Sequence, residues 1–199
     1  MTAALIVSLA LVAPPQVQAP VRPPDCELEV LTPQTLEELA LSEFRQGVDA
    51  YVRLHRRLER YLPPEQMFDD PEEMLEASDV LAAAIRAARP NARPGIIFKT
   101  GPTQLFRTII RNTLQEKRYF AGEMIAWLND ERDPKAWPPE VNGRYDWKLG
   151  AWMWPALLRK LPPLPPELEY RLVYTDLVII DLRADLVVDI LENAMPIED

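Results

Sequence analysis

Few side chains in this sequence could form a metal centre or a nucleophilic catalytic site. The chain contains one histidine, His55, and one cysteine, Cys26. A site for a soft or borderline metal needs several convergent nitrogen, sulfur or carboxylate ligands, so we expect no metal and no other cofactor. Catalysis by a Ser/His/Asp or Cys/His group would have to use His55, whose sequence neighbours form no nucleophile motif. We therefore predict no catalytic residue of this kind.

Carboxylates are abundant, so acid–base chemistry on an Asp/Glu pair remains open. Asp181 interrupts the most apolar segment near the C-terminus, and hairpin pairing with a two-residue turn would place it opposite Tyr170. We therefore predict a hydrogen bond between this phenol and this carboxylate, and a similar strand neighbour for Asp189. The acidic cluster that begins at Asp69 lacks the alternating ligands and central glycine of a calcium loop, so it indicates helix capping.

Two groups of side chains are candidates for binding a partner. The first is a basic helix face, which is either a solvated surface or a dock for an acidic partner or for acidic segments of the chain itself. The second is a set of tryptophans in a proline-rich segment, which either stack on a sugar or peptide or close a small core. The candidate residues are Arg53, Arg56, Arg57, Arg60, Trp152 and Trp154.

Helix signals dominate the first half of the chain. Thr32 and Pro33 predict a helix start, with the threonine hydroxyl as N-cap, and apolar residues then recur three or four positions apart. His55 lies on this apolar stripe, so we expect it to be half-buried and hydrogen-bonded. Residues 70–90 predict a second helix after a proline break, which suggests an antiparallel helical hairpin. A third and a fourth helix follow within residues 102–128.

The hydrophobic period changes from about 3.6 to two near residue 167. Residues 167–174 predict a strand with one wet face, because apolar and polar residues alternate strictly up to Leu172. Residues 177–182 are apolar on both faces apart from Asp181, which predicts a central and most buried strand, and residues 186–191 predict a third. Helices are the expected cover for this sheet. The sequence therefore predicts an α+β fold of three to four helices and a C-terminal three-stranded antiparallel β-meander that share one core.

The domain organisation follows from length and composition. A chain of 199 residues has room for one domain and one core, and 21 prolines against six glycines indicate stiff connections. We expect a single α+β domain over residues 35–196. Within it, residues 35–132 are helical, residues 133–166 are rich in proline and tryptophan and irregular, and residues 167–192 form the meander.

The N-terminus has the features of an export signal. Residues 1–13 are uncharged and apolar, as in the core of a signal peptide, and are too short to span a bilayer. We predict a signal peptide over residues 1–19, a proline-rich leader over residues 20–34, and no membrane span after cleavage. The expected location is periplasmic or extracellular. The net charge of −9 argues against nucleic acid as a partner, because binding to it requires clustered cations that neutralise phosphates.

Three segments resemble a known group of proteins. The segments SEFRQGVDAYVRLHRRLE, VNGRY and the final LPPLPPELEYRLVYTDLVIIDLRADLVVDIL resemble exported bacterial proteins of unassigned function, over about residues 43–196. This resemblance implies export and the final meander, and it implies no activity. The last 25 residues are also similar to the C-terminal region of periplasmic proteins of nickel and cobalt homeostasis.

Three functions remain in view at this point. Export, the lack of a catalytic constellation, and the basic and aromatic surfaces favour a non-enzymatic cell-envelope protein that binds a protein or an envelope polymer. A hydrolase that uses two carboxylates is the first alternative, and it requires a pocket with both groups facing it. A periplasmic accessory of metal homeostasis is the second, and it depends on the C-terminal similarity alone.

Overall fold

The computed structural model describes residues 32–64, 70–128, 138–145 and 153–196. All of them belong to one compact unit, Leu31–Asp199. The predicted signal peptide and most of the predicted leader, including Cys26, lie outside the described residues, as does Trp152.

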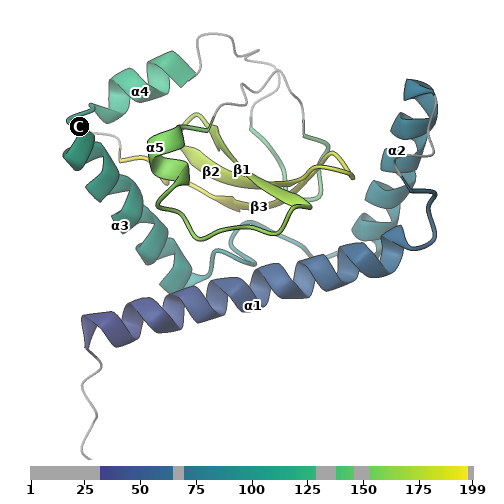
Figure 1. Ribbon diagram of the computed structural model, residues 1–199, viewed down its shortest axis with the longest axis horizontal. Coiled ribbons are helices and arrows are strands. Elements are labelled where there is room, and N and C mark those ends of the chain that lie inside the picture. Colours follow the sequence, from purple (N-terminus) through teal and green to yellow (C-terminus); the bar gives the residue numbers. More distant parts are fainter. Residues whose placement is uncertain (1–31, 65–69, 129–137, 146–152, 197–199) are drawn as a thin grey trace, which may run out of the picture. The chain divides into compact units, whose positions relative to one another are not determined.

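The described residues of this unit form five helices and one three-stranded antiparallel sheet, with the strand order β1-β2-β3 (Figure 1). This confirms the predicted α+β class and the C-terminal meander. The elements are α1 (Pro33–Glu59), α2 (Pro71–Ala88), α3 (Thr100–Lys117), α4 (Ala121–Leu128), α5 (Pro155–Leu158), β1 (Leu168–Val173), β2 (Asp176–Asp181) and β3 (Leu186–Leu191).

The helix starts follow the capping signals in the sequence. The Thr32 hydroxyl accepts a hydrogen bond from the amide of Thr35 at the start of α1, and the Asp70 carboxylate accepts one from Glu72 at the start of α2. Both caps satisfy amides that lack a partner in the first turn, as predicted. The second helix contacts the first, and α1 also contacts α3.

The register of the first hairpin differs from the prediction. Asp181 pairs with Leu168, and Tyr170 pairs with Ile179, so the predicted bond between Asp181 and Tyr170 is wrong. The turn lies one residue earlier than expected because Tyr174 adopts a left-handed conformation, with φ of 60°. Moving a turn by one residue moves every cross-strand partner by two. The Tyr170 hydroxyl instead donates to the carbonyl of Pro162 at 2.9 Å.

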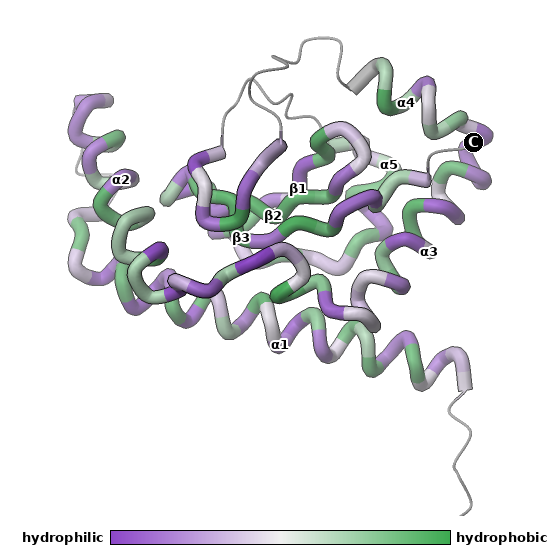
Figure 2. Tube along the Cα trace, turned by 180° about the vertical axis from the view of Figure 1, so that it is seen from behind, coloured by the Kyte–Doolittle hydropathy of each residue, from purple (hydrophilic) through white to green (hydrophobic). Residues whose placement is uncertain are grey.

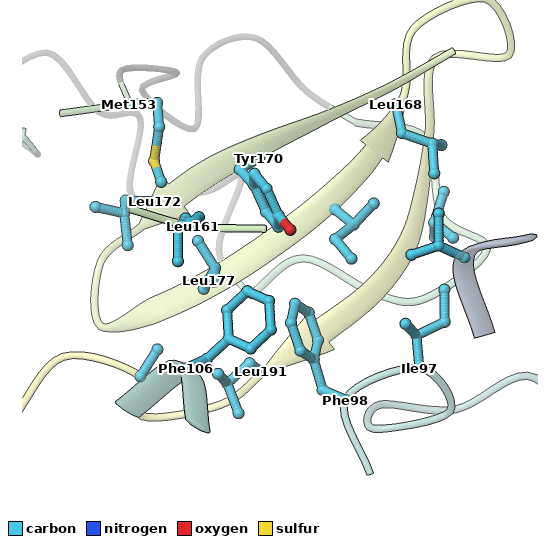
Figure 3. Packing of buried hydrophobic residues seen from close by; sticks show 14 of the residues in the cluster. Ile97, Phe98, Phe106, Met153, Leu161, Leu168, Tyr170, Leu172, Leu177 and Leu191 are labelled. Carbon is cyan, nitrogen blue, oxygen red and sulfur yellow. The ribbon is translucent and has the colours of Figure 1, made fainter. Parts of the chain in front are cut away.

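One face of the sheet forms the main core with the helices. Phe44 of α1, Phe98, Phe106 of α3 and Tyr170 of β1 pack ring against ring, with centroids 4.8 to 6.0 Å apart along the chain of contacts. Figure 3 shows Phe98, Phe106 and Tyr170 pointing into the same space. In Figure 2 hydrophobic and hydrophilic residues alternate along α1, as the 3.6-residue period requires. The shared core of helices and sheet is therefore confirmed.

The other face of the sheet packs a second, smaller cluster. Tyr145 and the partly buried Val141 lie against strand side chains that include Val178 and Ile180. The expectation that helices alone cover the sheet, with one core, is wrong for this face, because its described cover is the turn-containing segment 138–145. Backbone bonds hold this segment along β3, including Asn142 N to Val187 O at 2.8 Å. The segment thereby protects part of an edge strand.

Candidate functional site

A buried hydrogen-bond network joins α1 to the end of β2. Oδ2 of Asp181 accepts hydrogen bonds from the Tyr51 hydroxyl at 2.7 Å and from Nδ1 of His55 at 2.5 Å. Oδ1 accepts from the amides of Arg183 at 3.1 Å and Ala184 at 2.9 Å, so the same carboxylate closes the turn before β3. The sequence placed a polar residue in the central strand, and the structure shows that its partners come from α1 and from the turn.

Burial and neighbouring charges shift the pKa of two members of this network, His55 and Tyr51. Burial opposes protonation of His55, but the hydrogen bond to Asp181 and its charge outweigh burial, so the pKa of His55 is raised. Burial and the neighbouring Asp181 carboxylate raise the pKa of the Tyr51 phenol well above its usual value. The guanidinium of Arg89 lies 4.8 Å from the centre of the Tyr51 ring and donates to the carbonyl of Val188 at 3.0 Å. The network thus links side chains of α1 to the Asp181 carboxylate, with the Arg89 guanidinium beside it.

The position of His55 fits a structural role. His55 and Asp181 are both 0% exposed, and Nε2 of His55 lies 3.4 Å from Glu59 without forming a hydrogen bond. A substrate would have to displace packed side chains to reach this imidazole. The prediction of a hydrogen-bonded histidine on the apolar stripe is confirmed, although the residue is buried rather than half-buried.

A second buried carboxylate positions the start of α3. Oδ1 of Asp189 accepts hydrogen bonds from the amides of Gly95 at 2.8 Å and Ile96 at 3.2 Å, and Oδ2 accepts from Ile97 and Phe98, both at 2.7 Å. The prediction that Asp189 bonds to a side chain of a neighbouring strand is therefore wrong, because its hydrogen-bond partners are four amides of a loop. Gly95, with φ of 81°, lets this loop curl around the carboxylate. The loop leads directly into α3 and fixes its direction.

The outer flank of α3 carries a row of guanidinium groups. Phe106 and Ile110 face the core, whereas Arg107 and Arg111 lie one turn apart on the flank, and Arg118 follows at the C-cap. Arg107 donates to the backbone carbonyl of Glu192 at 2.9 Å, which ties the flank to the segment after β3. Arg111 and Arg118 form no ion pair within the described part of the chain.

Three open hollows follow this flank, and neighbouring hollows share lining residues; we call this row of hollows the α3 groove. The first hollow, at the start of α3, has a volume of about 520 Å³. It shares the lining residue Arg107 with the second hollow, which has a volume of about 360 Å³. The second hollow shares Arg111 and Pro196 with the third hollow, which lies at the end of α3 and has a volume of about 430 Å³. The charged residues that line the groove are Lys99, Arg107, Arg111 and Arg118, with no aspartate or glutamate among the lining residues.

The two ends of the α3 groove differ in character. The first hollow is lined mainly by polar side chains and by Lys99, whose ammonium lies 3.4 Å from Glu43. The last hollow is lined by Tyr119 and Phe120, which are 46% and 61% exposed. The Tyr119 ring packs edge-on against Trp154 with centroids 5.1 Å apart, so the aromatic end is held in place. The groove can therefore bind anions along its length and an apolar group at one end.

The predicted partner-binding residues lie elsewhere. Arg53, Arg56, Arg57 and Arg60 are exposed on α1 and its C-cap, and Nε of Arg56 lies 2.5 Å from Oε1 of Glu167. Thus part of this basic face pairs with an acidic residue of the chain itself. Trp154 is only 6% exposed and packs in the core, which leaves little of its ring for a ligand.

The residues of the α3 groove were missed from sequence. Arg107, Arg111 and Arg118 are spaced by four and seven positions, which is a helical repeat and could have been noticed. The signal was hidden because the same helix was interpreted only through its apolar face. The contribution of Asn193 and Pro196 had no sequence signal, since it depends on how the chain folds back after β3.

Comparison with known proteins adds no further constraint: no family model, no curated protein and no solved structure matches this chain. Within the described residues, no group of three His, Cys, Asp or Glu side chains could hold a metal ion. In the same part of the chain, no helix is long and apolar enough to cross a membrane. Function is therefore argued from the geometry of the groove.

Proposed function

We propose that this protein is a non-enzymatic, exported protein of the cell envelope that binds an anionic partner through the α3 groove. The observation that carries the proposal is the lining of the groove, whose charged side chains are all basic. Such a lining is a local reversal in a chain with a net charge of −9. A concave basic surface concentrates the field and attracts anionic groups.

The free cations of the groove support binding rather than folding. Arg111 and Arg118 are exposed, and no described carboxylate neutralises them. Arg56, in contrast, already pairs with Glu167. An anionic ligand would thus replace water at Arg111 and Arg118 without breaking a described ion pair, whereas at Arg56 it would compete with Glu167.

The alternatives receive less support. A carboxylate hydrolase needs two carboxyl groups that face one pocket, and none of the three hollows described above is lined by a carboxylate. The metal-homeostasis role depends on a similarity of the last 25 residues alone, and the described part of those residues serves the sheet and the end of the groove. Export is supported by the apolar N-terminal segment and by the resemblance to exported proteins.

A titration with a fluorescein-labelled oligoglutamate peptide, followed by fluorescence anisotropy, tests the proposal. The test variant is Arg111→Glu with Arg118→Glu, and the matched control is Arg53→Glu with Arg57→Glu on α1. Both variants change the net charge equally, so a nonspecific effect of charge would be the same in both. We expect the groove variant to bind at least about tenfold more weakly, and the control to bind within about twofold of wild type.

Two results would overturn the proposal. The first is no measurable binding of the peptide at low ionic strength, where exposed charges interact most strongly. The second is an equal loss of affinity in both variants, which would show that overall charge and not the groove attracts the peptide. Thermal unfolding of both variants checks that each remains folded.

A further inference from the structure

The α3 groove places cationic and apolar groups at fixed positions along one line. Arg107 and Arg111 lie on consecutive turns, and Arg118 lies at the end of the helix. At 1.5 Å per residue, the distance along the axis from Arg107 to Arg118 is about 16 Å. An extended peptide rises about 3.3 Å per residue, so about five residues would span the row.

The apolar end of the groove is next to the last guanidinium. Tyr119 and Phe120 directly follow Arg118, and Leu114 and Ala121 line the same hollow. Phe120 is 61% exposed and follows the 46% exposed Tyr119, so the two rings give this end of the groove an apolar surface. A ligand that fits this end must therefore carry a bulky apolar group close to its last anionic group.

The backbone at Arg118 holds these two features together. Arg118 has φ of 54°, in the left-handed region that favours glycine at helix C-caps. Its amide donates to Gln115 O at 3.1 Å, and the amide of Tyr119 donates to Leu114 O at 3.1 Å, which fixes the turn. A side chain is thus retained at a position where glycine is the more favourable residue, and it lines the groove.

These features distinguish between the two kinds of partner in the proposed function. An anionic polymer of sugars or phosphates supplies the charges, and a sugar ring can stack on an aromatic side chain, but such a polymer carries no bulky hydrophobic side chain beside its charges. A peptide can supply both, with carboxylate side chains and one aromatic or large aliphatic residue. The mixed lining therefore favours a protein segment.

We infer that the ligand of the α3 groove is an extended acidic peptide of about five residues with a bulky apolar residue at one end, which packs on Phe120 and Tyr119. This inference rests on the proposed function, because it identifies the partner of the same groove. It requires that the acidic residues lie along Arg107, Arg111 and Arg118, and that the apolar residue reaches the hollow beyond Arg118.

The test uses labelled peptides of equal charge and length. One is oligoglutamate with an alanine at each end, and the other two carry a tryptophan in place of either the N-terminal or the C-terminal alanine. We expect one of the tryptophan peptides to bind at least about fivefold more tightly than the other two, because the groove has a direction. Oligogalacturonate, with carboxylates and no apolar side chain, should bind no more tightly than the alanine peptide.

A pair of aromatic variants assigns the gain to the groove. Phe120→Ala should remove the advantage of the tryptophan peptide, whereas Tyr61→Ala should keep it, since Tyr61 is an exposed aromatic residue outside the groove. Equal binding of all three peptides, or tighter binding of oligogalacturonate, would overturn this inference and leave the proposed function standing. Failure of every anion to bind would overturn the proposed function itself.

Discussion

Replacing Arg118 by glycine should raise the stability of the fold and lower the affinity of the α3 groove at once. Arg118 has a positive φ of 54° at the C-cap of α3. Glycine adopts this conformation without a clash, because it has no Cβ. The same change removes one of the three guanidiniums of the groove, none of which has a described ion-pair partner. If Arg118 served folding alone, its replacement would not raise stability and lower affinity at the same time.

The size of both effects can be worked from the structure. The left-handed conformation costs a residue with a Cβ about 1 to 2 kcal/mol, and the greater flexibility of glycine in the unfolded chain offsets about 0.5 to 1 kcal/mol of the gain. The net stabilisation is about 0.5 to 1 kcal/mol, which raises the melting temperature by about 2 °C for a domain of this size. Loss of one charged hydrogen-bond donor weakens peptide binding roughly tenfold.

Thermal unfolding followed by circular dichroism and anisotropy titration with the oligoglutamate peptide measure the two effects. Arg118→Lys is the control, since it keeps the charge and the backbone strain, and we expect its melting temperature to stay near that of wild type. A lower melting temperature for Arg118→Gly would refute the reasoning about strain. Unchanged affinity would refute the place of this guanidinium in the site.

Three further predictions concern the buried carboxylates and the edge segment. Asp189→Ala leaves four loop amides without their acceptor. It should therefore lower the free energy of unfolding, measured in urea, by about 3 kcal/mol or more. A loss below about 1 kcal/mol would contradict the role of this carboxylate. The raised pKa of His55 means that its stabilising contribution is complete below about pH 6.5 and is lost as the pH rises through the folded-state pKa. Wild type should therefore lose stability relative to His55→Gln as the pH rises above about 6.5, and a relative gain would contradict the sign. Gly143→Ala would place its Cβ 2.8 Å from the carbonyl oxygen of Glu140. Because the amide of Val187 donates to the carbonyl of Gly143, we expect a lower melting temperature and faster amide exchange at Val187. Unchanged values would show that the segment adjusts freely.

Local sequence patterns predicted the elements of this fold well. The change of period near residue 167 predicted three strands, and these are β1, β2 and β3. Thr32 and Asp70 predicted two helix starts, and both side chains accept the expected amide. These successes share a physical basis, because capping and hydrophobic period depend on residues a few positions apart.

Long-range contacts were not predictable in the same way. Asp181 was assigned a partner on the neighbouring strand, but its partners are Tyr51 and His55, which are 130 and 126 positions away. The shift of the first turn depends on the left-handed conformation of Tyr174, which is uncommon for an aromatic residue and has no local signal. A polar residue in a buried strand indicates that a partner exists, but not where it lies in the chain.

The candidate site likewise combines residues that a local sequence pattern shows with residues that only the fold brings together. Arg107, Arg111 and Arg118 repeat on one side of α3 and were visible in the sequence as a pattern. That they line a groove depends on the segment that contains Asn193 and Pro196, which packs beside α3 only in the folded chain. The tryptophans drew attention first, and Trp154 contributes by supporting Tyr119 from the core.

Mapping of the bound peptide by NMR tests the proposed groove most directly. In a titration of ¹⁵N-labelled protein with the tighter of the two tryptophan peptides, we expect the amide signals that shift to belong to residues 99–121 and 193–196, with the largest shifts near Arg118 and Phe120. Shifts confined to residues 53–60 on α1, or small shifts spread evenly over the sheet and helices, would contradict the assignment of the α3 groove as the binding site.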